Sequence, residues 1–103
     1  MPMSTAIEFD ARDLAAFCMR NGIRRLSLFG SAITDRFGPA SDVDLLVEFE
    51  EGRVPGLLRL AGMELELAPL FGEREVELRT YEDLSRYFRE EVRSTAEPVY
   101  VAA

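Results

Sequence analysis

The sequence contains no histidine, no lysine and no tryptophan, and its single cysteine is Cys18. Without histidine, a Ser/His/Asp relay, an imidazole base and histidine-ligated zinc are excluded. Without lysine there can be no Schiff base and no Walker-type phosphate loop. One cysteine cannot form an internal disulfide, which fits a reducing compartment. The chemistry left to this chain therefore uses carboxylates, hydroxyls and arginine, and carboxylates are ligands for hard divalent metal ions.

The charge balance and the length narrow the class further. The chain has 103 residues, of which 19 are acidic and 12 basic, for a net charge of -7. Because basic side chains provide most of the affinity for a phosphate backbone, we expect no direct nucleic-acid binding. No apolar run approaches the roughly 20 residues of a bilayer span, and the first residues do not resemble a secretion signal. We expect one cytoplasmic domain, residues 1–103, with no membrane contact.

Hydrophobic spacing along the chain alternates between extended and helical periods. Strands are predicted at residues 23–29, 42–49, 75–80 and 99–101, and helices at residues 10–20, 31–37, 57–71 and 83–96. The near-continuous apolar run in residues 42–49 favours a central strand covered on both faces. The expected fold is α/β (α+β), a small mixed sheet of three to four strands with helices packed on it.

Two of these helices depend on finer detail. Residues 63–67 alternate like a strand within a longer helical pattern, and the length of the whole run favours a helix that Pro69 kinks or ends early. In residues 83–96 the buried side is expected to carry apolar side chains at helical spacing, namely Leu84, Tyr87, Phe88 and Val92.

Gly30 and Ser31 stand where the first strand passes into the predicted helix 31–37. Such a junction presents free backbone N–H groups and the positive end of the helix dipole, and both attract phosphate oxygens. A Gly-Ser pair is more often an ordinary turn with a helix cap, so this feature alone does not identify a phosphate site.

Three acidic residues form the second feature. Asp42 and Asp44, two positions apart on a strand, project from the same face and can hold a metal ion. Glu77 in the third strand can complete a three-acid site if that strand lies beside the second. Glu75 points the same way as Glu77 and competes for this role. The alternative is that all these acids are simply solvated.

The combined order of these residues is more specific than any one of them. The segment LFGS-AITDRFGPAS-DVDLLVEF resembles the minimal nucleotidyltransferases of the DNA polymerase beta-like superfamily. The similarity continues through Leu70 to Leu78 and through the final segment DLSRYFREEVRSTAEPVY, so it covers most of the chain from Ile23. More narrowly, a free-standing domain of this size resembles the antitoxin subunits that pair with HEPN-domain ribonuclease toxins.

The resemblance implies roles for individual residues. Asp42 and Asp44 would hold one or two Mg²⁺ ions, and Gly30 with Ser31 would bind the triphosphate of ATP. Glu77 takes the place of the family's third acid, which is usually aspartate. Its extra methylene is expected to shift the geometry of the metal ligands or to slow the transfer reaction. Arg36 and Arg79 are treated as ordinary surface arginines.

The implied function is transfer of AMP from ATP to a tyrosine hydroxyl of a HEPN-domain toxin, in a hetero-oligomer with it. Two alternatives stay open at this point. The first is an antitoxin that neutralises the toxin by binding alone, with a slow or inactive Glu77 site. The second is a nucleotidyltransferase that acts on a small molecule.

Overall fold

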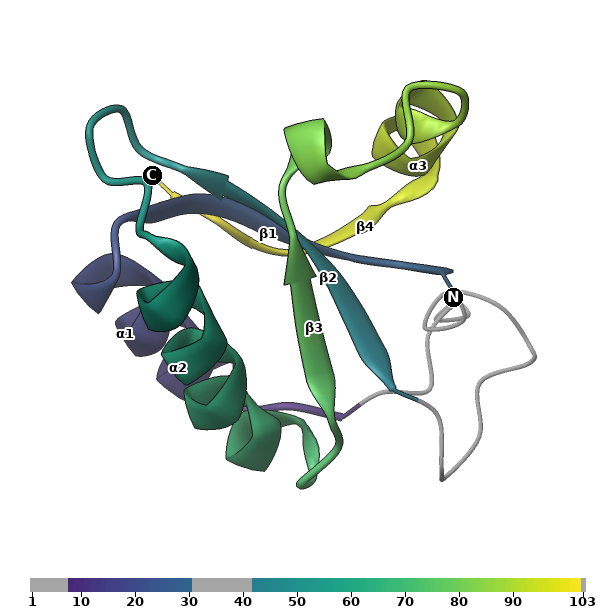
Figure 1. Cartoon of the computed structure of the whole chain (residues 1–103). Coiled ribbons are helices and arrows are strands. Elements are labelled where there is room, and N and C mark those ends of the chain that lie inside the picture. The colour runs from purple at the N-terminus through teal and green to yellow at the C-terminus, as the bar shows by residue number, and fades with distance from the viewer. Residues whose placement is uncertain (1–7, 31–41, 103) are drawn as a thin grey trace.

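The computed structural model describes residues 8–30 and 42–102. Within these ranges the helices and strands are α1 (Ala11–Arg20), β1 (Ile23–Phe29), β2 (Val43–Phe49), α2 (Leu57–Leu67), β3 (Val76–Arg79), α3 (Arg89–Thr95) and β4 (Glu97–Val101). Two short 3₁₀ helices, η2 (Ala68–Phe71) and η3 (Tyr81–Asp83), flank β3. The mixed α/β fold that the sequence predicts is confirmed (Figure 1). The helix predicted at residues 31–37 lies outside the described residues.

The four strands form one mixed sheet in the order β3-β2-β1-β4. β1 pairs antiparallel with both β2 and β4, whereas β2 and β3 are parallel. A parallel pair needs a crossover connection, and α2 supplies it. β2 is therefore an inner strand, as its apolar run predicts, and the tail forms an edge strand, as its sequence predicts. None of the helices in the described part of the chain is long and apolar enough to cross a membrane.

The hydrophobic core lies between the sheet and the two helices α1 and α2, which occupy the same side of it (Figure 1). From β2 the core receives Val43, Leu45 and Val47, so the intervening Asp44 projects from the opposite face. From α1 it receives Cys18, whose complete burial raises the pKa of its thiol to about 12. Cys18 is therefore a protonated core side chain, as expected of a small buried hydrophobe.

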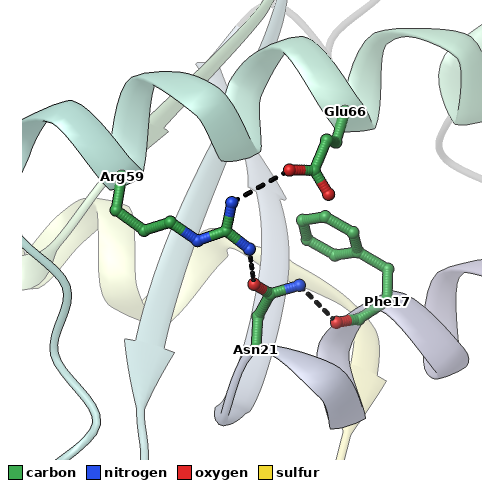
Figure 2. Close-up of polar contacts among 4 residues, drawn as sticks. All are labelled: Phe17, Asn21, Arg59 and Glu66. Carbon is green, nitrogen blue, oxygen red and sulfur yellow. Dashed lines mark hydrogen bonds and ion pairs between the residues drawn. The ribbon is translucent and has the colours of Figure 1, made fainter.

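Polar contacts fix both ends of α1. At its start the Asp10 carboxylate accepts the backbone N–H groups of Arg12 and Asp13, at 2.9 and 3.0 Å, which confirms the predicted N-cap. At its end Asn21 donates its side-chain amide to the Phe17 carbonyl at 2.8 Å and accepts a hydrogen bond from Arg59 of α2 (Figure 2). The two helices that cover the core are thus also joined at their surface.

The ambiguous stretch from Leu57 is a helix, and it ends as its proline predicts. The α-helix stops at Leu67, and Pro69 lies in the first turn of η2, which buries Phe71. α2 turns only part of its apolar surface inward. Met63 and Leu67 are buried, whereas Leu58 and Leu65 are 90% and 77% exposed.

The helix predicted over residues 83–96 is wrong in its first half. Thr80 and Asp83 form a reciprocal capping box that starts η3 instead, and Leu84 follows in an extended conformation. The α-helix begins only at Arg89. Leu84 is buried as expected, but Tyr87 is 85% exposed and Phe88 50% exposed. The apolar residues of this segment have helical spacing in the sequence, although they do not all belong to one helix.

A carboxylate from α2 occupies the free edge of the sheet. β3 is one of the two edge strands, and the backbone N–H of Leu78 donates to Glu64 Oε2 at 2.8 Å in a partly buried position. We expect Glu64→Ala to lower the free energy of unfolding by about 1–2 kcal/mol, because it leaves this amide without its charged acceptor. Glu64→Gln keeps an acceptor oxygen and is expected to lose less. Urea unfolding measures both changes.

Glu66, two residues further along α2, provides the matched control. Its carboxylate accepts from Arg59 at 3.0 Å, and about half of each side chain is exposed (Figure 2). Such exposed pairs contribute between about 0 and 1 kcal/mol, so Glu66→Ala is expected to change stability little. Equal losses for Glu64→Ala and Glu66→Ala would contradict the role assigned to the Leu78 contact.

Candidate functional site

The acidic residues gather at one end of the sheet, where β1 ends and β2 and β3 begin. Asp44 lies opposite Phe29 of β1 on one side and Glu77 of β3 on the other. Because β2 and β3 are parallel, Asp42 and Glu75, each two residues earlier, come to the same end of the same face. This face is the one turned away from the core. The expectation that the third strand lies beside the second is confirmed.

Three of these carboxylates converge closely. One oxygen each from Asp42, Glu75 and Glu77 can be chosen so that all three lie within 4.8 Å of one another. Asp42 and Glu75 are exposed and Glu77 is half-buried. The structure therefore brings together the predicted Asp42 and Glu77, and it adds Glu75 beside Glu77 rather than in its place. Three carboxylate oxygens form a donor set of the kind that Mg²⁺ and Mn²⁺ prefer.

Asp44 lies opposite Glu77 on the neighbouring strand but is not a member of this group of three. It is half-buried, and the pKa of its carboxyl is raised above its ordinary value by desolvation first and by the neighbouring charges of Glu77 and Asp42 next. Arg79 opposes this shift and lowers the pKa. Ionisation of Asp44 therefore carries an electrostatic cost, and a bound cation would relieve it.

Gly30 borders the site from the end of β1. Its φ of +68° is a left-handed conformation that glycine adopts without strain. A Cβ at this position would lie 2.8 Å from Asp44 Oδ2, so the absence of a side chain leaves room for that carboxylate. The second residue of the predicted pair, Ser31, lies outside the described residues.

Arg79 is the one feature of the site that the sequence left as an ordinary surface residue. Its guanidinium donates to Glu77 Oε1 at 2.9 Å, with about half of the arginine side chain exposed. The spacing of two residues on a strand was the available signal, because it places Arg79 and Glu77 on the same face. One oxygen of Glu77 is therefore engaged by an arginine.

Sequence comparisons show which known proteins this chain is similar to. A family model described as the nucleotidyltransferase domain matches residues 13–98. MJ0435 of Methanocaldococcus jannaschii, a candidate protein adenylyltransferase, is 32% identical over 85 residues, which cover 82% of this chain and 88% of that protein. The protein adenylyltransferase MntA of Thermococcus cleftensis is 42% identical over 55 residues, which cover 53% of this chain and 54% of that protein.

Solved structures agree with the sequence comparisons. A protein described as a candidate minimal nucleotidyltransferase superposes with a TM-score of 0.68 at 38% identity, over 85% of this chain and 87% of that one. A chain from a toxin-antitoxin crystal structure with AMP-PNP gives a TM-score of 0.71 at 16% identity, over 90% of this chain and 74% of that one. At this lower identity the second likeness concerns the fold alone.

Proposed function

Because this chain belongs to the nucleotidyltransferase domain family, we propose that it is a Mg²⁺-dependent protein adenylyltransferase that uses ATP to modify a partner toxin. The acceptor is a tyrosine hydroxyl of a HEPN-domain ribonuclease, and the attached AMP inactivates this ribonuclease. The two proteins form a hetero-oligomer in the cytoplasm. Two relatives that carry the name protein adenylyltransferase support the activity, and the partner is proposed from a toxin-antitoxin crystal structure in which one chain has this fold. The observation that carries the proposal is the convergence of carboxylates beside Gly30 at the strand ends.

The donor set fits magnesium. Among the histidine, cysteine, aspartate and glutamate side chains of the described residues, those that converge there are all carboxylates, which suit a hard ion rather than one that needs imidazole or thiolate. Asp42, Asp44 and Glu77 would hold the metal, and two ions are expected. When bound, the ions neutralise charge on the triphosphate and make the acceptor hydroxyl more acidic.

The residues of the chain then position and neutralise the reactants. Gly30 and Ser31 bind the triphosphate, with the acceptor hydroxyl in line with the α-phosphorus. A new bond forms between the hydroxyl oxygen and the α-phosphorus as the bond to the bridging oxygen breaks, and pyrophosphate leaves with that electron pair. The hydroxyl proton passes to a carboxylate of the site, and the role proposed for Glu77 is either to accept this proton or to hold the metal that makes the hydroxyl more acidic.

The direct test is intact mass spectrometry of the partner. The purified chain is mixed with the product of its neighbouring gene, ATP and Mg²⁺, and the partner is expected to gain the mass of one or more AMP units. Asp42→Asn is expected to abolish the gain. Glu51→Gln, which removes a charge from an exposed loop residue, is expected to retain it. No gain with any of the three proteins would contradict the proposal.

The same experiment separates the two alternatives. The hydrogen bond from Arg79 engages one oxygen of Glu77, and a Glu77 carboxylate held in this way would slow AMP transfer. This observation favours an antitoxin that acts by binding alone. In that case Asp42→Asn still suppresses the ribonuclease, and the partner mass stays constant. A small-molecule nucleotidyltransferase is indicated if the neighbouring protein lacks a HEPN-like helical pattern and AMP is incorporated into a small acceptor.

A further inference from the structure

The acidic end of the sheet holds one carboxylate more than the proposed ligand set requires. Glu75 precedes β3, and its carboxylate can approach both Asp42 and Glu77 within 4.8 Å. It is exposed, so it does not contribute to the core. Packing in the core therefore does not explain why Glu75 lies among the other three acids.

Among the described residues, the carboxylates that converge at Glu75 form few ion pairs. Three carboxylates converge, and the guanidinium of Arg79 is bound to only one of them, Glu77. Within residues 8–30 and 42–102 neither Asp42 nor Glu75 forms an ion pair. Like charges repel by about 1 kcal/mol per pair at 4 Å even in water, so this grouping favours a cation between them.

The contact of Arg79 also limits what Glu77 can offer. With Oε1 engaged at 2.9 Å, Glu77 has only its second oxygen fully available to a metal. Among the described residues Glu75 has no ion-pair partner, and one of its oxygens lies within 4.8 Å of an oxygen of Asp42 and of Glu77.

From these contacts we infer that Glu75 is a direct ligand of the divalent cation, alongside Asp42 and Glu77. This inference rests on the proposed function, because it concerns the metal of the same site. A hard ion binds more tightly as the number of carboxylates increases, so loss of the Glu75 charge weakens the site even without nucleotide.

The test measures metal binding rather than activity. Titration of the purified chain with Mn²⁺ alone, followed by the loss of the free-ion EPR signal, gives the dissociation constant. Glu75→Gln is expected to raise that constant about 10-fold. Glu51→Gln removes the same charge from a distant exposed loop and is expected to change it less than about two-fold, since exposed charges are screened. Mg²⁺ is expected to displace the Mn²⁺ in each protein.

Asp42→Asn separates failure of this inference from failure of the proposed function. If Asp42→Asn weakens Mn²⁺ binding and Glu75→Gln binds like Glu51→Gln, the role of Glu75 is overturned and the metal site stands. If the unaltered chain binds no Mn²⁺ at millimolar concentrations, both ideas fail together. Because Glu75 is exposed, its substitution is expected to leave the thermal unfolding midpoint unchanged or higher, and a scan of each variant verifies the fold.

Discussion

Asp44→Asn is expected to reduce AMP transfer about 10³-fold or more and at the same time to stabilise the metal-free protein. Activity falls because the substitution removes a charged oxygen from the proposed set of metal ligands. Stability rises because the half-buried Asp44 is repelled by Glu77 and Asp42 and is poorly solvated. Screening by solvent keeps this gain on the order of 0.5–1 kcal/mol, which corresponds to roughly 2–6 °C in the unfolding midpoint of a domain of this size.

The pH dependence of this gain has a definite sign. The pKa of Asp44 is raised in the folded protein, so the ionised carboxylate costs stability at neutral pH. That cost disappears as the pH falls from above the folded-state pKa to below the ordinary value, where the group is protonated in both states. The difference in midpoint between Asp44→Asn and the unaltered chain should therefore be largest near neutral pH and shrink on acidification.

Two controls accompany the Asp44 measurement. Glu51→Gln changes the net charge equally at an exposed loop position and is expected to alter neither activity nor midpoint appreciably. Added Mg²⁺ should raise the midpoint of the unaltered chain and have less effect on Asp44→Asn, because only the former keeps the full ligand set. A midpoint that falls in Asp44→Asn would show that this carboxylate stabilises the fold, contrary to the electrostatic argument.

Much of the sheet could be predicted because each strand carries its own signal. The alternation in residues 23–29 and 75–80 and the apolar run after Asp42 correspond to β1, β3 and β2. Once β2 and β3 are adjacent, the period of two residues places the acids on one face without further information. The clustering of the acidic residues at one end of the sheet could therefore be predicted from the sequence.

Other features depended on contacts that no local pattern encodes. The error in residues 83–96 came from treating Tyr87 and Phe88 as buried, whereas the capping box of Thr80 and Asp83 starts a separate 3₁₀ turn. The sequence presents Glu75 and Glu77 as competitors for one position, whereas the register of β2 and β3 brings both carboxylates into one cluster. The bond of Arg79 to Glu77 likewise depends on side-chain conformation rather than on composition.

Gly30→Ala is expected to lower AMP transfer about 10²-fold and to destabilise the fold by about 1–2 kcal/mol, through two separable effects. The backbone effect arises because alanine is strained at a φ of +68°. The site effect arises because the new Cβ would lie 2.8 Å from Asp44 Oδ2, so the carboxylate must move away from its place among the other acids. Transfer assays and urea unfolding measure the two effects independently.

Gly52→Ala isolates the backbone effect. Gly52 has a φ of +79°, and a Cβ there would meet nothing within 4 Å. The two alanine variants therefore share the strain of a left-handed residue, and only Gly30→Ala disturbs Asp44. Gly52→Ala is expected to lose about 1 kcal/mol of stability with activity within two-fold of the unaltered chain, because its strain is remote from the acids.

If Gly30→Ala is destabilised like Gly52→Ala and yet transfers AMP at the normal rate, the close approach of Gly30 to Asp44 has no part in positioning the carboxylate. If activity falls only in Gly30→Ala, the missing side chain at the end of β1 is a requirement of the chemistry rather than of the turn.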